Sequence, residues 1–179
     1  MKATGIVRRI DDLGRVVIPK EIRRTMRIRE GDPLEIYTSR EGEVIFKKYS
    51  LLGGVDEFAE QLCETLSKHT GFLCAVSDRD SVIAAAGGGK RELLGKRISP
   101  QLEEILESRR IYQRAEGQSL PVVEGSDRYL TAVAAPILSE GDLLGLVILA
   151  GQEPRIAVGD TEYKLAQTIA AFLGRHMES

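Results

Sequence analysis

The stretch from Asp12 to Arg24 constrains the fold most, because it places a glycine turn, a short β-branched run and a proline within a few residues. The β-branched run, residues 16–18, favours a strand because branched side chains fit a pleated surface. Pro19 has no N–H to give a strand ladder, but it suits the first position of a helix. We therefore expect a strand that leads into a short helix from Lys20 to Met26, a rigid mount for Arg15, Arg23 and Arg24.

The first fifty residues predict a small unit of four strands and one short helix. The strands are expected at 4–10, 16–18, 34–37 and 44–48, and each is bounded by a turn rich in Gly, Asp or Glu. About fifty residues is close to the lower limit for a domain that is stable alone. An intertwined dimer with one shared core would resolve this difficulty.

Charge is distributed unevenly along the chain. Residues 1–50 hold 12 Lys and Arg against 8 Asp and Glu, a net charge of +4, whereas the remaining 129 residues carry −6. A basic module joined to an acidic remainder is typical of a nucleic-acid-binding unit attached to a domain that does not bind nucleic acid. Chance variation between short segments is the competing explanation.

Four motifs in the first fifty residues occur in a specific order and spacing: Gly5–Arg8, Gly14–Pro19, Ile22–Arg24 and Leu34–Tyr37. In this respect residues 1–50 resemble the AbrB-type transition-state regulator domain. The resemblance implies a swapped-hairpin dimer, in which two chains interleave their strands, and it implies double-stranded DNA as the partner. By motif position, the DNA contacts would come from Arg8, Arg15, Arg23 and Arg24. Lys20 departs from the family's most familiar member by being basic, and we expect it to add a phosphate contact.

The rest of the chain predicts an α+β domain. Helical stripes are expected from Val55 to Thr70, after Ser99 and from Asp160 to Met177, with Ser99 and Asp160 as helix caps. Strands are expected at 72–76 and 82–86, a loop at 87–89, and a central hairpin from 129–137 and 143–150. Over its whole length the chain resembles the sporulation branch of the AbrB family, which implies that this second half is a GAF-like sensor domain. The expected organisation is a DNA-binding domain at 1–50, a linker at 51–55 and a GAF-like domain at 56–179.

Two questions about the second half stay open from the sequence. Its first and last helices are amphipathic, so they could join subunits into a tetramer or pack within one subunit. The domain could sense a small-molecule effector or serve oligomerisation alone. If there is a ligand, the polar loop residues expected around it are Asp78, Arg91, Ser99 and Arg128, although plain surface exposure explains each one equally well.

Catalysis is not expected. His69 and His176 lie near helix ends without a cluster of acidic residues or cysteines at ligand spacing, so we expect no metal ion and no cofactor. Gly89-Lys90 lacks the other residues of a phosphate-binding loop. Cys63 and Cys74 read as buried thiols of a cytoplasmic protein, and the first residues lack the apolar core of a signal peptide.

These patterns together predict a cytoplasmic, DNA-binding transcription regulator. The family resemblance implies a role late in sporulation, with both activation and repression. An antitoxin of the same superfamily is a less favoured alternative, because such tails tend to be disordered and residues 55–179 are patterned for folding. A GAF-type signalling protein that acts through a protein partner is the alternative from a different class.

Overall fold

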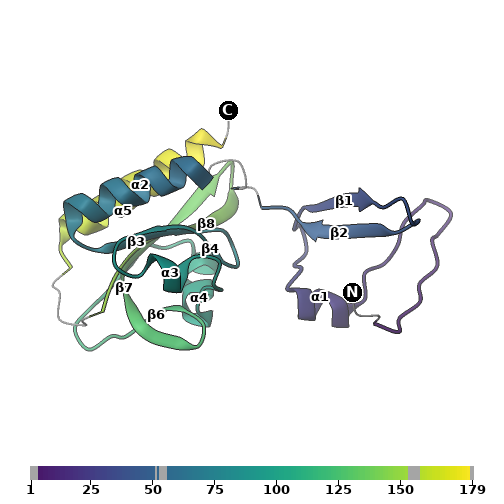
Figure 1. Ribbon diagram of the computed structural model, residues 1–179, viewed down its shortest axis with the longest axis horizontal. Helices are drawn as coiled ribbons and strands as arrows, with labels where there is room; N and C mark the ends of the chain where they lie inside the picture. The colour runs from purple at the N-terminus through teal and green to yellow at the C-terminus, as the bar shows by residue number, and fades with distance from the viewer. Residues whose placement is uncertain (1–3, 51, 53–55, 153–157, 178–179) are drawn as a thin grey trace. The chain divides into compact units, whose positions relative to one another are not determined.

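The computed structural model describes residues 4–50, 52, 56–152 and 158–177. The chain divides into two compact units, Met1–Tyr49 and Ser50–Ser179, and each is described by itself (Figure 1). Of the expected linker at 51–55, only Leu52 is among the described residues, and the expected helix start at Val55 lies outside them.

The first unit contains one short helix and one hairpin. Helix α1 (Lys20–Met26) follows Pro19, which is its N-cap rather than its first residue, because a ψ of 149° keeps Pro19 extended. The helix ends at Arg27, whose backbone is left-handed (φ 50°) and whose N–H donates to the carbonyls of Arg23 and Arg24. Strands β1 (Leu34–Thr38) and β2 (Val44–Lys48) pair antiparallel, in register from Leu34 opposite Lys48 to Thr38 opposite Val44.

The strands expected at 4–10 and 16–18 are wrong for the single chain. Neither segment belongs to a strand, although the turn between them forms as expected: the Gly14 N–H donates to the Asp11 carbonyl (3.0 Å) and the Asp11 N–H donates to the Arg15 carbonyl (3.1 Å). A strand exists only where a neighbouring strand completes its hydrogen-bond ladder. Within the described part of one chain, no such neighbour lies beside these two segments.

The first unit has almost no interior. Among its described residues only Pro19 is buried. Large apolar side chains that normally fill a core are open to solvent: Val7 is 89% exposed, Val17 70%, Ile36 61% and Phe46 41%. A single copy of this unit therefore gains little stabilisation from apolar burial.

The second unit is built on an antiparallel sheet. Its strands are β3 (Leu73–Ser77), β4 (Val82–Ala86), β5 (Tyr112–Gln113), β6 (Pro121–Val123), β7 (Ser126–Ser139) and β8 (Asp142–Gly151). The order is β4-β3-β8-β7-β5, with β6 also paired to β7. The β7–β8 hairpin therefore occupies the middle of the sheet, as the two long apolar runs predicted.

Helices cover both faces of this sheet (Figure 1). Helices α2 (Asp56–Thr70) and α5 (Asp160–His176) lie together over one face and share a core with it. Helices α3 (Lys90–Leu93) and α4 (Pro100–Ser108) pack on a second core at the other face. Among the described residues, no helix has the length and apolar character that crossing a membrane requires.

The helix starts test three local predictions. Ser99 caps α4 as expected, because its hydroxyl accepts a hydrogen bond from the Leu102 N–H (3.2 Å). The prediction that Asp160 caps α5 is wrong. Gly159 is the N-cap, and its N–H donates to the carboxylate of Glu162, a residue of the first turn (2.8 Å). The loop expected at 87–89 is confirmed. Helix α3 begins directly after it, and Leu93 of this helix is fully buried.

Candidate nucleic-acid interface and ligand pocket

The five basic residues expected at the DNA are all exposed. Arg8 precedes the turn at residues 11–14 and Arg15 follows it. Lys20, Arg23 and Arg24 lie on α1, three and four residues apart, so their side chains start from one face of the helix. The structure thus places three of the five cations together on α1 and the other two on either side of one turn, with Arg15 directly after it.

Arg15 is held in place by Asp11. The Arg15 Nε donates to Asp11 Oδ2 (2.8 Å), while Asp11 Oδ1 accepts from the backbone N–H groups of Arg15 (2.8 Å) and Leu13 (3.0 Å). The backbone bond from Arg15, followed by the bond from its side chain, lowers the pKa of the Asp11 carboxyl below its usual value. Among the described residues, the terminal nitrogens of Arg15 have no hydrogen-bond partner. They are the nitrogens that bind an anion bidentately.

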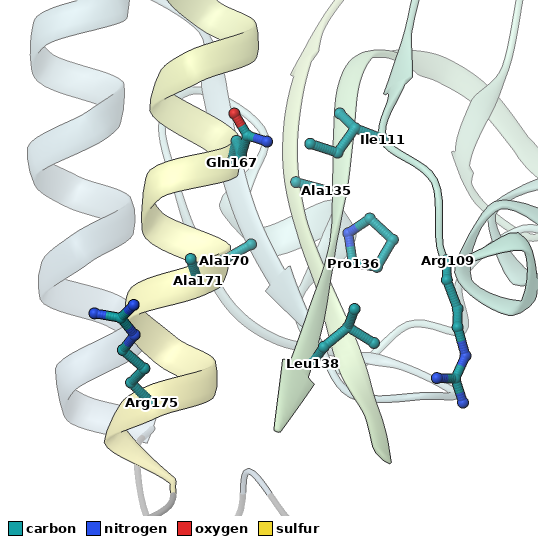
Figure 2. Close-up of a pocket in the computed structure, with 9 residues that line it drawn as sticks. All are labelled: Arg109, Ile111, Ala135, Pro136, Leu138, Gln167, Ala170, Ala171 and Arg175. Atoms are coloured by element: carbon teal, nitrogen blue, oxygen red, sulfur yellow. The ribbon is translucent and has the colours of Figure 1, made fainter. Parts of the chain in front are cut away.

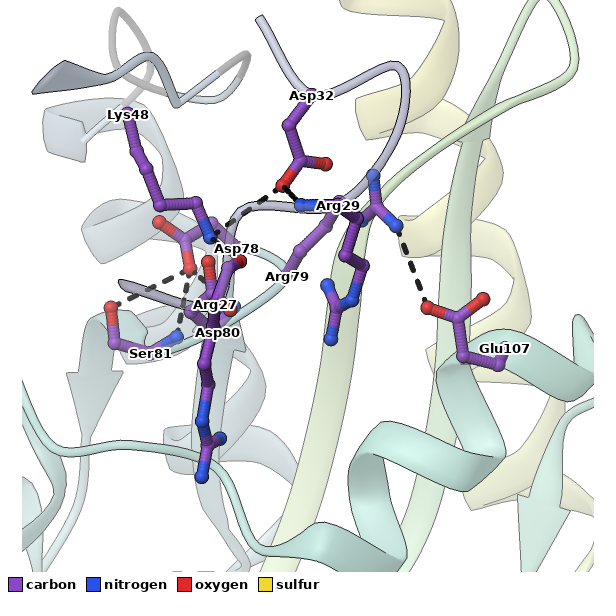
Figure 3. A network of polar contacts seen from close by, with 9 residues as sticks. All are labelled: Arg27, Arg29, Asp32, Lys48, Asp78, Arg79, Asp80, Ser81 and Glu107. Atoms are coloured by element: carbon purple, nitrogen blue, oxygen red, sulfur yellow. Dashed lines mark hydrogen bonds and ion pairs between the residues drawn. The ribbon is translucent and has the colours of Figure 1, made fainter. Parts of the chain in front are cut away.

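A second set of polar contacts fixes the end of α1 to the hairpin (Figure 3). The Asp32 side chain is only 5% exposed; it accepts from the Arg29 N–H (2.8 Å) and lies 3.8 Å from the Lys48 ammonium. Lys48 also donates to the carbonyl of Arg27, the residue that ends α1 (3.0 Å). Sequence reasoning missed these residues, although the Gly31-Asp32-Pro33 turn was a signal. These contacts hold the end of α1, the helix that carries three of the cations, in place on the hairpin.

The four residues expected around a ligand have separate local roles. Asp78 accepts from the N–H groups of Asp80 and Ser81, both at 2.8 Å, and so closes the β3–β4 turn (Figure 3). Ser99 is buried as the cap of α4. Arg128 pairs with Glu92 of α3 (2.7 Å), the helix that also carries the exposed Arg91. Arg128 therefore contacts the helix that carries Arg91. The hydrogen bonds of Asp78 and Ser99 are to other residues and do not join these two side chains to Arg91 or Arg128.

A pocket of about 400 Å³ lies elsewhere, between β7, α5 and the segment after α4 (Figure 2). None of the four expected ligand residues lines it. Its polar lining is Arg109, Gln167 and Arg175, and its apolar lining is Ile111, Ala135, Pro136, Leu138, Ala170 and Ala171. Sequence reasoning missed this pocket, although two adjacent small residues in α5 and a proline inside a long strand were signals for it.

The two cysteines and His176 pack against other side chains. Cys63 and Cys74 are free and buried, and burial raises the pKa of each thiol to about 12. His176 stacks on Phe58, with ring centroids 5.0 Å apart, and lies 6.3 Å from the ring of Phe172. Across the described ranges, no three or more His, Cys, Asp and Glu side chains are grouped to hold a metal ion.

Two family models match the chain. Residues 54–178 match the family described as stage V sporulation protein T C-terminal, transcription factor. Residues 7–50 match the family described as antidote-toxin recognition MazE, bacterial antitoxin.

Individual proteins show how far each likeness extends. Stage V sporulation protein T of Bacillus subtilis is 46% identical over 99% of both chains. The transition state regulatory protein AbrB of Bacillus subtilis is 63% identical over 49 residues, which are 27% of this chain and 50% of that protein. The GAF domain of an Acinetobacter phosphoenolpyruvate-protein phosphotransferase is 12% identical, with a TM-score of 0.53 over 74% of this chain and 84% of that one. This last likeness shows that the second unit has a GAF-like fold. With its C-terminal family model and its full-length relative, the chain belongs to the stage V sporulation protein T family of transcription factors.

Proposed function

We propose that this chain is a DNA-binding transcription regulator in which residues 1–50 read DNA through Arg8, Arg15, Lys20, Arg23 and Arg24. The observation that carries the proposal is the pre-set guanidinium of Arg15, whose Nε is held by Asp11 while its terminal nitrogens have no partner among the described residues. Guanidinium groups pair bidentately with phosphate and with guanine edges. The sequence likeness to a transition state regulatory protein over the same residues supports this assignment.

The active form of the first unit is proposed to be a swapped-hairpin dimer. Its large apolar side chains are exposed in one copy, and two of them, Ile36 and Phe46, face each other across the β1–β2 hairpin. Segments 4–10 and 16–18 have strand-forming sequences and no ladder partner within the described chain. A second copy would supply both an apolar surface and the missing strands, and it would double the set of DNA-facing cations.

The second unit is proposed to join two such dimers into a tetramer through α2 and α5. The ring centroids of Phe58 in α2 and Phe172 in α5 lie 5.7 Å apart where the two helices meet, a line of contact called the seam here, and Phe172 is 48% exposed. An exposed aromatic side chain on a paired-helix seam is a typical contact of a larger helix bundle. The same unit would bind a small-molecule effector that changes how the two DNA-reading modules are spaced.

The family also supports a biological setting for this regulator. The protein would act in the cytoplasm, late in sporulation, with both activating and repressing effects and without an enzymatic step. Its functional boundaries would be 1–50 for the DNA reader, 51–55 for the linker and 56–179 for the sensor and assembly domain.

The test is DNA binding by the full chain across a salt series, with Arg15→Ala and Arg23→Ala against the unmodified protein. Each phosphate contact that is lost should weaken binding and reduce the salt slope by about 0.9, or roughly 1.8 when both copies of a dimer lose it. Arg40→Ala is the matched control, because Arg40 is an exposed arginine of the same unit outside the family motifs. Equal affinity in all four proteins, with unchanged circular dichroism, would reject the assignment and favour a signalling protein that acts through a protein partner.

A further inference from the structure

The pocket between β7 and α5 lies on the flank of α5 that faces away from α2 (Figure 2). On the α2 side, Phe172 is close to Phe58, whereas on the pocket side the helix presents Ala170 and Ala171. These two side chains are short, so they leave space beside β7 unfilled, and this space is the hollow. The apolar lining of the pocket therefore lies on a different side of α5 from the contact between Phe58 and Phe172.

The floor and the rim of this pocket differ in chemistry. The floor is apolar, and its volume of about 400 Å³ falls within the range of small-molecule sites. Figure 2 shows Arg109 and Arg175 on opposite sides, with Pro136 and Leu138 between them. No acidic side chain lines the pocket. In the part of the chain that the structure describes, the side chains of Arg109, Arg175 and Gln167 have no hydrogen-bond or ion-pair partner.

Arg109 has an unusual backbone for its residue type. It ends α4 in the left-handed region (φ 57°), and its N–H donates to the Leu106 carbonyl (3.1 Å). Glycine takes this conformation at lower cost than a residue with a side chain. The backbone therefore gives no reason for an arginine here, whereas its guanidinium at the rim of the pocket does.

We propose that this pocket binds a small organic acid with an apolar body and one anionic head group. The apolar floor would take the body, and the guanidinium group of Arg109 would take the head, because Figure 2 shows the guanidinium group of Arg175 on the opposite side, toward α2. An inorganic anion would leave the floor empty, and a long polar ligand such as a nucleotide would leave its own polar groups unpaired on it. The inference deepens the sensing role proposed above and rests on it, because it names the class of effector.

The test uses octanoate as the probe, with the full chain in isothermal titration calorimetry. One site per chain is expected, with a dissociation constant of roughly 10 μM to 1 mM. Arg109→Gln should weaken binding about tenfold, because it removes a charge-assisted hydrogen bond. Arg175→Gln should change the affinity little, because the guanidinium group of Arg175 lies on the opposite side, toward α2. Arg110→Gln should bind as the unmodified protein does, since Arg110 is exposed next to Arg109 and does not line the pocket.

Three further comparisons make the site specific. Ala171→Phe should fill the pocket and abolish binding, whereas Ala115→Phe, at an exposed alanine outside it, should not. Octanol and inorganic phosphate, each lacking half of the proposed ligand, should bind at least tenfold more weakly than octanoate. No octanoate binding, or binding that is equal in Ala171→Phe, overturns the proposal. DNA affinity measured on the same samples distinguishes this failure from failure of the DNA-binding proposal, because Arg15 and Arg23 are unchanged.

Discussion

A side-chain carbon placed on Gly174 of α5 would lie only 2.0 Å from the carbonyl oxygen of Leu138 in β7. The helix therefore meets this strand backbone to backbone, and only glycine fits at the crossing. The approach fixes where α5 lies on the sheet. It also fixes the wall of the pocket that Ala170, Ala171 and Leu138 share.

Gly174→Ala should destabilise the second unit by about 1–3 kcal/mol, the typical cost of forcing extra volume into a packed site. The loss should appear although alanine is the better helix former by about 1 kcal/mol. Urea unfolding followed by circular dichroism would measure it. Gly88→Ala is the control, because no atom lies within 4 Å of the added carbon at Gly88. An equal and small change in both variants would contradict the close crossing.

The ionisation of Asp11 should respond only in part to Arg15→Ala. The pKa of this carboxyl is lowered first by the Arg15 backbone N–H and then by the Arg15 side chain, and the substitution removes only the second. Because the folded pKa is depressed, the contribution to stability is present above the unfolded value of about 3.9 and is lost as pH falls through the folded value. Carboxyl carbon NMR should therefore show the pKa of Asp11 rising in Arg15→Ala yet staying below its ordinary value. A complete return to the ordinary value would mean that the backbone bond is unimportant.

Cys63 and Cys74 should be inert in the folded protein. Burial raises the pKa of both thiols to about 12, so almost no thiolate is present at pH 8. Because a raised pKa keeps the proton on the folded state, the contribution to stability is complete below the unfolded value of about 8.5 and is lost as pH rises toward 12.

A thiol reagent such as DTNB at pH 8 should react slowly with the native chain and rapidly, with two equivalents, after denaturation. The single variants Cys63→Ser and Cys74→Ser should each retain one equivalent. Fast reaction of either thiol in the native protein would contradict the buried placement.

Phe46→Asp should dissociate the proposed dimer of the first unit. Phe46 lies opposite Ile36 on the hairpin, and a charge placed there would be buried unpaired in a shared core. Analytical ultracentrifugation should show a smaller species, and DNA affinity should fall at least tenfold, because each copy would then bind with half of the cations. Arg40→Asp makes a larger charge change of the same sign in the exposed hairpin turn and should leave assembly intact. Dimers of unchanged affinity in Phe46→Asp would exclude this face as the dimer contact.

Phe172→Ala should reduce the assembly from four chains to two without unfolding the second unit. The side chain is about half exposed, so its removal should lower the free energy of unfolding of a single subunit less than removal of a core side chain would. Light scattering after gel filtration would give the mass. Thr168→Ala, at an exposed position of α5 one turn earlier, should keep the larger mass. If the mass were the same in both variants, α2 and α5 would serve packing within one subunit, the alternative that the sequence left open.

The sequence predicted the elements that short-range patterns determine. The cap at Ser99, the hairpin of β7 and β8 and the stripe of α2 depend on neighbours a few residues away, and these predictions are confirmed. A strand at 4–10 or 16–18 requires a partner strand, and the local sequence pattern does not show where that partner comes from. These two predictions were therefore wrong for a single chain. The pocket collects Ile111, Pro136 and Ala171 from three distant segments, and no periodicity links such positions. Arg15 could be chosen from its motif, whereas its bond to Asp11 needed the turn geometry.

The nearly coreless first unit has a consequence for gene control. In the proposed dimer, the DNA reader acquires its interior from a second copy, so its folding is a bimolecular reaction and its folded fraction depends on how much protein the cell has made. At low copy number the reader would be unfolded as well as dilute. Occupancy of the operator would then rise more steeply than in proportion to expression, which gives a developmental regulator a threshold without any additional component.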